Sequence, residues 1–337
     1  MNKLGRQSAF HIGELSEIAS ARRAGNDLAR QLGFDETRTG QLAIVITEAA
    51  TNIVKHAVEG VILIRSLEHE GQAGIEIVAI DKGPGMENVA LRMQDGHSTA
   101  GTYGVGMGAI SRLSSEFDIY SSPGCGTALL MVLWATGAGS ARPRWQLGAV
   151  CLPIGGEDVS GDAWDIGQSP GGLTIATADG LGHGPEAALA SERAVEAIAA
   201  HAGSSAAALV TLAHEKLRGT RGAALAVSVI DADKGTLCFA GVGNIAGSIL
   251  HDAGRNHLMS HNGIVGSNLR KVQEFVHPWS PGALLILHSD GLATRWDVDS
   301  YPGLRMRHPA LVAAVLYRDF VRGRDDAMIL VVREAES

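Results

Sequence analysis

The stretch that decides the fold runs from residue 175 to residue 191 and reads IATADGLGHGPEAALAS. Its apolar beginning is typical of a buried β-strand, and its alanine-rich end, with Pro185 in the first turn, is typical of a helix. Asp179, Gly180 and the run Gly182-His183-Gly184 stand between the two. A connecting loop needs glycine, but it needs neither a carboxylate at the strand end nor a histidine four residues later. We therefore interpret Asp179 as a metal ligand.

Other aspartates repeat this pattern in the second half of the chain. Asp162 stands in SGD, Asp290 in SDG, and Asp325-Asp326 in RDD, mostly at the edges of apolar runs. Mg²⁺ and Mn²⁺ prefer carboxylate, carbonyl and water oxygens, and a following glycine lets its own carbonyl reach the same ion. Four aspartates converging from one sheet edge can hold two cations about 4 Å apart and activate a water toward phosphorus. Each Asp-Gly alone is equally compatible with an ordinary turn.

Length and composition limit the class of protein. A chain of 337 residues favours two domains, and 45% hydrophobic with 19% charged residues is typical of a globular protein. The net charge of -8 and the lack of a Lys/Arg cluster argue against nucleic-acid binding. Three cysteines without a CxxC argue against a disulfide framework and a cysteine zinc site. No signal peptide or apolar stretch of about 20 residues is present, so we expect a cytoplasmic protein without membrane contact.

The pattern along the chain predicts an α+β protein with two domains. Helices are expected at 14–33 and within 35–60, followed by a β-hairpin, a glycine-rich region, a helix and two strands. A Gly/Ser/Pro/Arg-rich linker at 137–144 then separates a first domain, 1–136, from a second domain, 145–337. In the second domain, two helices interrupt a series of antiparallel strands, which indicates a sandwich.

One predicted helix of the first domain carries polar residues at helical spacing. In TEAATNIVKHA, Glu48, Asn52 and His56 follow one another at intervals of four residues and so share one face. A carboxylate and an amide on one face can act as general base and metal ligand. A solvated polar stripe is the alternative for this helix taken alone.

Two glycine-rich loops follow. In AIDKGPGM, Asp81 ends a strand and can accept a hydrogen bond from an exocyclic amine such as adenine N6, while glycines let the ring lie close. The loop glycines there are Gly83 and Gly85. In AGTYGVGMGAI, backbone N–H groups before a helix can cradle phosphates. The glycines of that stretch are Gly101, Gly104, Gly106 and Gly108. Neither a Rossmann fingerprint nor a P-loop is present.

The order of motifs in the second half resembles the SpoIIE-type branch of the protein phosphatase 2C superfamily. These are bacterial metal-dependent phosphoserine/phosphothreonine phosphatases with an αββα sandwich. The stretch FAGVGNI, 239–245, is similar to RsbX-like phosphatases. The resemblance implies two Mn²⁺ or Mg²⁺ ions, with Asp162 and Asp179 as the bridging, catalytic pair, the Gly180 carbonyl assisting, and Asp290 and Asp325 on the second ion.

The chain departs from the family pattern in two places and leaves one role open. Met328 stands where the family often has Thr or Ser, and Ser160 stands where it commonly has glycine. Neither departure removes an expected metal ligand. His183 either touches the substrate or only orders the turn.

The three motifs of the first half, in TEAATNIVKHA, AIDKGPGM and AGTYGVGMGAI, resemble those of the GHKL, or Bergerat, ATP-binding fold, an α/β sandwich. Within that fold they resemble the serine kinases of the RsbT/RsbW/SpoIIAB type. The resemblance implies that ATP binds with Mg²⁺, that Asn52 coordinates the magnesium, and that Glu48 activates the attacking serine. It further implies that Asp81 reads adenine and that the glycine loop closes on the phosphates.

Together the two resemblances imply a bifunctional regulator of a partner switch. Such a protein removes phosphate from a serine or threonine of a small STAS-domain protein and carries an opposing kinase. In the alternative, the first domain binds only ATP or a partner, such as a STAS protein, a sigma factor or a stress-signalling complex, and regulates the phosphatase. Glu48 favours the first interpretation, because a pure binding module needs no base.

Overall fold

The computed structural model describes residues 3–93, 106–136, 143–169, 171–252 and 254–335. The chain divides into two compact units. The first unit consists of residues 1–146 together with 297–318, and the second consists of 147–296 together with 319–337. The segment 297–318, which the sequence places in the second domain, therefore groups with the first unit. Most of the predicted linker lies outside the described residues.

The first unit is built on a six-stranded antiparallel sheet. Its order is β1 (Lys3–Leu4), β3 (Gly60–His69), β4 (Gln72–Asp81), β6 (Thr127–Trp134) and β5 (Glu116–Ser121), and β2 (Ser8–Ile12) also pairs with β3. The predicted hairpin is β3–β4. Its two-residue turn holds Glu70 and Gly71, both at positive φ, which matches the right-handed twist of the strands.

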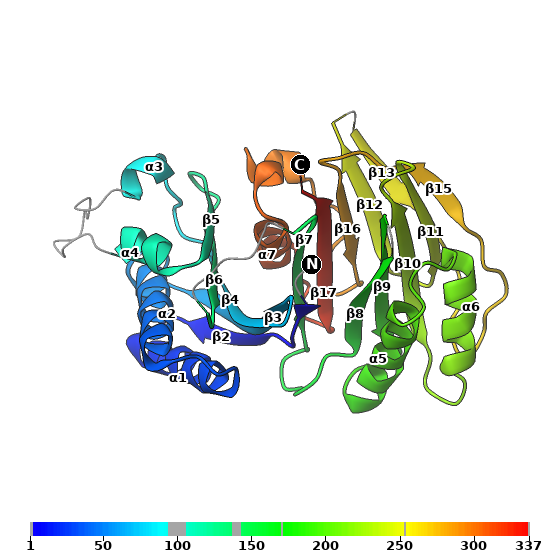
Figure 1. The fold of residues 1–337 in the computed structure, drawn as a ribbon, viewed down its shortest axis with the longest axis horizontal. Coiled ribbons are helices and arrows are strands. Elements are labelled where there is room, and N and C mark those ends of the chain that lie inside the picture. Colours follow the sequence, from blue (N-terminus) through cyan, green and yellow to red (C-terminus); the bar gives the residue numbers. More distant parts are fainter. Residues whose placement is uncertain (1–2, 94–105, 137–142, 170, 253, 336–337) are drawn as a thin grey trace. The chain divides into compact units, whose positions relative to one another are not determined.

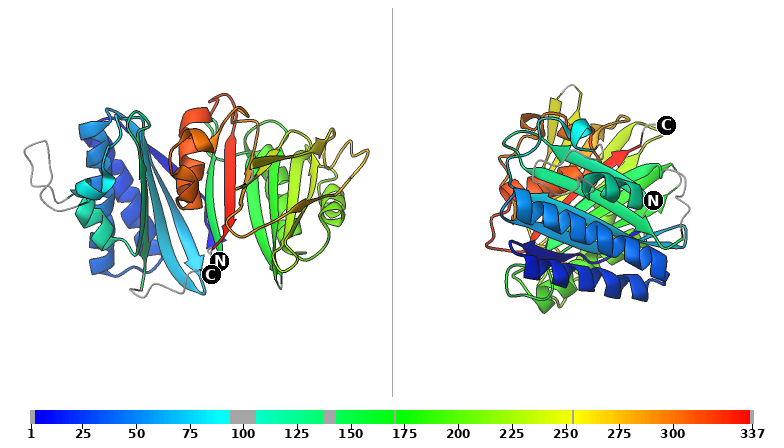
Figure 2. Two further views of the ribbon diagram at one scale, coloured as in Figure 1. Left: turned by 90° about the horizontal axis from the view of Figure 1, so that it is seen from above. Right: turned by 90° about the vertical axis from the view of Figure 1, so that its left-hand side faces the viewer.

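Two long helices cover one face of this sheet, as both views of Figure 2 show. These are α1 (Leu15–Gln31) and α2 (Glu36–His56), which confirm the helices expected there. The Asp35 carboxylate caps α2 by accepting the Arg38 N–H at 2.6 Å. Leu42, Val45, Ile46 and Ala49 of α2 are buried against the isoleucines of the sheet, so the opposite face of α2 is left to its polar residues. Two short helices complete the region, α3 (Val89–Arg92) and α4 (Gly106–Leu113).

The segment 297–318 adds two 3₁₀ turns and a helix to the first unit. They are η1 (Val298–Ser300), η2 (Leu304–Met306) and α7 (Pro309–Phe320), whose residues up to Arg318 group with this unit. The Asp118 carboxylate on β5 accepts the His308 N–H at 2.8 Å and lies 3.2 Å from the Arg307 guanidinium. Tyr301 packs edge-on against Tyr120. Polar and aromatic contacts thus hold the segment against β5.

The second unit is a sandwich of two largely antiparallel sheets. One has the order β14 (Ser260–His261), β11 (Thr236–Val242), β10 (Ala223–Asp231), β9 (Gly172–Gly180), β8 (Asp162–Ser169), with β15 (Phe275–Pro278) also on β11. The other has the order β13 (Gly254–Leu258), β12 (Ala246–His251), β16 (Leu284–His288), β17 (Ala327–Glu334), β7 (Trp145–Leu152). Both sheets confirm the predicted α+β class.

Two helices pack on the β8–β11 sheet, α5 (Pro185–Ala199) and α6 (Ala206–Lys216), as Figure 1 shows. The interface is rich in alanine: Ala190, Ala194 and Ala213 are buried on the helices, and Ala176 and Ala178 are buried on β9. Small side chains let the helices approach the sheet closely, so the strand end at Asp179 and the start of α5 are placed together by packing. None of the helices in the described part of the chain combines the length and apolar character needed to cross a membrane.

Candidate functional site

The core of the candidate metal site is one cross-strand pair. β8 begins at Asp162, β9 ends one residue after Asp179, and in the antiparallel register these two residues are direct partners. Residues opposite each other in this way have their Cβ atoms about 4.5–5.5 Å apart. Two carboxylates therefore face the same point at the edge of the sheet.

The second sheet contributes through the residues that follow β16. The Ser289 hydroxyl donates a 2.6 Å hydrogen bond to Asp162 Oδ2 and accepts the Met328 N–H at 3.0 Å. Asp162 is 5% exposed and Ser289 is 1% exposed, so this contact lies inside the protein. It brings Asp290, the next residue, to the same edge as Asp162 and Asp179.

The two adjacent aspartates before β17 differ in their surroundings. Both oxygens of Asp326 accept backbone N–H groups, one from Ile154 and one from Gly161, each at 2.7 Å. Asp326 is therefore a structural tie between β17 and the loop that precedes β8. Asp325 is exposed, and its Oδ1 accepts only a local N–H, from Asp326, among the hydrogen bonds resolved for it. Of the pair, Asp325 is the one whose carboxylate is not occupied by hydrogen bonds to a distant part of the chain, and its role as a metal ligand stays a prediction.

The electrostatics of the cluster favour a bound cation. Burial raises the pKa of Asp162 well above its usual range, and the neighbouring charge of Asp179 raises it further. Burial also raises the pKa of Asp179 to about 7, with Asp290, Asp325 and Asp326 adding to the effect. Like charges in a poorly hydrated place destabilise one another unless protons or cations neutralise them. The all-oxygen donor set fits Mg²⁺ or Mn²⁺.

The carboxylates lie near one another, but they do not form a complete set of metal ligands. The described residues contain no group of three or more His, Cys, Asp or Glu side chains in the arrangement that holds a metal ion.

The glycines after two of these aspartates are required by packing. A Cβ atom on Gly180 would stand 2.1 Å from the carbonyl oxygen of Ala187 on α5, and one on Gly291 would stand 2.0 Å from the carbonyl oxygen of Asp326. Neither glycine has positive φ. The Asp-Gly pairs thus reflect close backbone approach around the carboxylates and not a special turn conformation.

Side chains that the sequence did not single out also contact the metal-site residues. The Asn244 amide, in the loop between β11 and β12, donates a 2.7 Å hydrogen bond to Asp290 Oδ2. The Ser289 hydroxyl acts in the same way on Asp162. Asn244 lies within the stretch FAGVGNI, which was noted for its resemblance alone. The signal for both residues was proximity in sequence to a motif.

The turn after Asp179 is fixed by a side-chain pair. His183 Nδ1 lies 2.7 Å from Glu157 Oε1, and the glycines on either side of the histidine, Gly182 and Gly184, have positive φ. This contact orders the loop, which is one of the two roles left open for His183.

In the first unit, the polar face of α2 meets the start of α4. A Cβ on Gly106 would stand 2.9 Å from Glu48 Oε2 and 3.7 Å from Asn52 Oδ1, so the helix start lies directly against both side chains. Asn52 Nδ2 is buried and has no hydrogen-bond partner among the described residues. Such a donor is costly unless an acceptor satisfies it, and the oxygens of a bound nucleotide fit that requirement. Gly108 also lies in α4, whereas Gly101 and Gly104 lie outside the described residues.

Asp81 ends β4 in a confined loop. Its Oδ1 accepts the N–H groups of Gly83 at 2.8 Å and Thr127 at 3.2 Å, and burial raises the pKa of this carboxyl. Gly85 has φ of 73°, and a Cβ there would stand 2.0 Å from the Ser122 carbonyl oxygen. The Arg318 guanidinium donates a 2.8 Å hydrogen bond to the Asp81 carbonyl oxygen. Asp81 is therefore held rigidly at the strand end.

Comparisons with known proteins assign a family to each of the two regions that carry these residues. Residues 13–133 match the histidine kinase-like ATPase domain family, and residues 169–334 match the family of stage II sporulation protein E. The serine/threonine-protein kinase RsbT of Bacillus subtilis (strain 168) is 35% identical over 128 residues, which make up 38% of this chain and 96% of RsbT.

The chain is a fusion of an RsbT-family domain with a SpoIIE-family domain. Both family predictions are thereby confirmed. Glu48, Asn52 and Asp81 fall inside the matched part of the RsbT-family domain. Asp179, Asp290 and Asp325 fall inside the matched part of the SpoIIE-family domain, and Asp162 lies seven residues before it.

Solved structures show the same folds. One from work on the bacterial stressosome, described as a modular system adapted to control secondary messenger signaling, is 30% identical with a TM-score of 0.53 and covers 57% of this chain and 100% of its own. The structure of RsbX in complex with magnesium is 18% identical with a TM-score of 0.50, over 58% of this chain and 97% of RsbX. At that identity RsbX shows the fold alone.

Proposed function

We propose that this chain is a bifunctional regulator of a partner switch. Its SpoIIE-family domain removes phosphate from a phosphoserine or phosphothreonine of a STAS-domain protein, at the site formed by Asp162, Asp179, Asp290 and Asp325. Its RsbT-family domain binds ATP with Mg²⁺ and phosphorylates a serine or threonine. The likeness to RsbT, a serine/threonine-protein kinase, and to a stressosome structure supports a protein substrate of this signalling class.

One observation carries the phosphatase half of the proposal. Asp162 and Asp179 are register partners on neighbouring strands, and the two carboxylates sit where burial and like charge raise the pKa of both. A protein gains nothing in stability from such a pair, so the arrangement is understandable as a site for cations.

The residues of the site have distinct tasks in this mechanism. Two Mn²⁺ or Mg²⁺ ions would supply charge neutralisation and an activated water for attack on phosphorus. Asp162 and Asp179 would hold both ions, the Gly180 carbonyl would assist, and Asp290 and Asp325 would complete the set. Ser289 fixes Asp162, and Asn244 orients Asp290, through the hydrogen bonds described above.

Phosphate release from a phosphorylated STAS protein tests this half. The purified chain with Mn²⁺ should release phosphate, and Asp179→Asn should abolish the release while leaving the protein folded. Asp299→Asn, an exposed aspartate on η1, serves as the matched control and should be without effect. If the Asp179→Asn variant still releases phosphate, Asp179 is a turn residue and not a metal ligand.

The kinase half rests on Glu48, Asn52 and Asp81. Asn52 would hold the Mg²⁺ of the nucleotide, Asp81 would accept the adenine amine, and Glu48 would take the proton of the attacking hydroxyl. Phosphate transfer from labelled ATP to the unphosphorylated STAS protein should be lost in Glu48→Gln, while nucleotide binding persists. If the wild-type chain binds ATP but transfers no phosphate, the domain is a regulatory nucleotide- or partner-binding module, which is the alternative proposal.

A further inference from the structure

An arginine lies against the loop that follows Asp179. Arg221 precedes β10, and the neighbouring backbone is fixed in register with the end of β9: Ala223 pairs with Gly180, and the Leu181 N–H donates to the Gly222 carbonyl at 3.0 Å. The guanidinium of Arg221 reaches over the loop itself, because a Cβ on Gly182 would stand 3.2 Å from its Nη1. Arg221 is thus a cation placed over the loop that follows Asp179.

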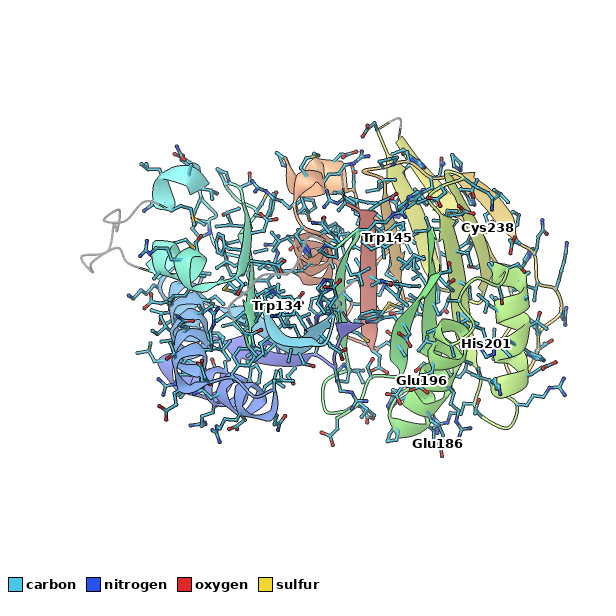
Figure 3. The ribbon with its side chains drawn as sticks, viewed as in Figure 1. Trp134, Trp145, Glu186, Glu196, His201 and Cys238 are labelled. Carbon is cyan, nitrogen blue, oxygen red and sulfur yellow. The ribbon has the colours of Figure 1, made fainter. Side chains whose placement is uncertain are left out.

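Among the described residues, the guanidinium of Arg221 forms an exposed ion pair with Glu186. Arg221 Nη2 lies 2.6 Å from Glu186 Oε2, and Glu186 stands in the first turn of α5, where Figure 3 labels it. The two side chains are 47% and 69% exposed. An ion pair this exposed contributes little to stability, so an incoming anion can replace the glutamate at low cost.

The chemistry of the loop identifies the anion. A planar guanidinium binds the oxygens of a phosphoryl group in a bidentate manner, and a phosphoryl group must approach Asp179 for the proposed reaction. A substrate dianion near five aspartates also needs a compensating positive charge in addition to any metal. Arg221, which lies against Gly182 of this loop, can supply that charge.

From this geometry we propose that Arg221 binds the phosphoryl group of the substrate and that Glu186 holds the guanidinium in place until the substrate arrives. This inference rests on the proposed phosphatase function and adds a substrate-binding residue to it. It makes a prediction that a purely structural ion pair does not make. Removing Arg221 and removing the charge of Glu186 must have opposite effects on substrate binding.

The experiment uses the full chain loaded with Mn²⁺ and para-nitrophenyl phosphate, whose only charged group is the phosphoryl. Arg221→Ala should raise KM about tenfold or more, as expected for loss of a charged hydrogen bond, with a smaller change in kcat. Arg221→Lys should recover part of the loss. Glu186→Gln should lower KM by about two- to fivefold, since it frees the guanidinium from a weak pair. Arg218→Ala, an exposed arginine in the same connection, is the matched control.

A binding readout independent of turnover accompanies the kinetics. Inorganic phosphate should raise the unfolding temperature of the Mn²⁺-loaded wild type, and this rise should be smaller in Arg221→Ala and larger in Glu186→Gln. Equal losses of activity and of unfolding temperature in both variants would overturn the proposal, because they would make the pair structural. An unchanged KM for para-nitrophenyl phosphate, or an effect seen only with a phosphoprotein, would also overturn it. A wild type that shows no Mn²⁺-dependent release at all would instead refute the proposed phosphatase function.

Discussion

Asp179 is partly buried opposite Asp162, and three further aspartates act on it electrostatically. Its pKa is about 7, against an ordinary value of 3.8. Because the folded state therefore keeps a proton that the unfolded state has lost, this residue favours folding at low pH and ceases to do so as the pH rises from about 4 to about 7. Residues selected for chemistry often oppose stability in this way.

The first prediction concerns the stability of the metal-free chain. Its unfolding temperature should fall between pH 5 and pH 8, and Asp179→Asn should raise it at pH 8 by about 3–6 °C, because the buried negative charge is gone. Mn²⁺ should stabilise the wild type more at pH 8 than at pH 5, where protons compete for the same oxygens. Thermal unfolding followed by circular dichroism, with and without EDTA, measures all three effects. A midpoint of Asp179→Asn at or below that of the wild type at pH 8 would contradict the pKa argument.

The second prediction concerns Asn244, which orients Asp290 through a 2.7 Å hydrogen bond. Asn244→Ala should weaken Mn²⁺ binding about tenfold, since the partners of ligand residues affect metal affinity nearly as much as the ligands do. Calorimetric titration of Mn²⁺ provides the measurement. Asn256→Ala, an exposed asparagine on β13, should bind Mn²⁺ as the wild type does. Equal affinity in Asn244→Ala would mean that Asp290 needs no orientation.

At the scale of secondary-structure elements, the junction of β9 with α5 determines where Asp179 stands. The helix approaches the strand so closely that the Ala187 carbonyl occupies the space where a side chain at position 180 would begin. Alanine-rich packing between α5 and the sheet makes this approach possible. The position of the candidate site is therefore a consequence of helix–sheet packing as well as of the loop.

The third prediction follows from that junction. Gly180→Ala should destabilise the chain by about 1–3 kcal/mol, the usual cost of overpacking, and should also weaken Mn²⁺ binding by moving Asp179. Gly155→Ala is the control, because nothing lies within 4 Å of a Cβ at that position. Urea unfolding of the two variants at pH 5.5 measures the effect of packing on the free energy of unfolding, because repulsion among the carboxylates is reduced at that pH. Equal stability of both variants would show that α5 can move away from β9 without lowering the free energy of unfolding.

Sequence reasoning reached the elements and motifs but not the contacts between distant parts of the chain. The sequence predicted the strands that lead to Asp179 and Asp290 and the helix that carries Glu48. Each of them shows a local hydrophobic periodicity next to a polar residue. Asn244 acting on Asp290, and Ser289 acting on Asp162, bridge 46 and 127 positions. No local pattern encodes such pairs, because they exist only once the two sheets have packed.

On the scale of the whole molecule, the two family matches do not coincide with the two compact units. The SpoIIE-family match extends over residues 169–334, yet residues 297–318 within it pack in the first unit, together with the RsbT-family domain. Arg318, 8% exposed, reaches the carbonyl of Asp81, the residue proposed to read adenine. That contact was not predictable from the sequence, which assigned the segment to the second domain by its position alone.

The fourth prediction concerns this segment. Arg318→Ala should weaken the binding of Mg²⁺-ADP to the full chain about tenfold, because the Asp81 loop loses a charged hydrogen bond that holds its backbone. Calorimetry or fluorescence of a labelled nucleotide gives the affinity. Arg22→Ala, an exposed arginine on α1, is the control. An unchanged affinity in Arg318→Ala would show that the Asp81 loop keeps its shape unaided.

The placement of residues 297–318 also bears on how such a chain can be taken apart or recombined. Cutting within 137–144 would separate the two homologous sequences, but the kinase-like fragment would lose the segment 297–318, whose residues contact Asp81, Asp118 and Tyr120. In a chimera that exchanges the first 136 residues for those of a free-standing relative, Arg318 would still meet a backbone carbonyl, but Arg307 would keep its ion pair only with a carboxylate at the position of Asp118. Modules joined in this manner can be inherited, duplicated or engineered only as a matched set.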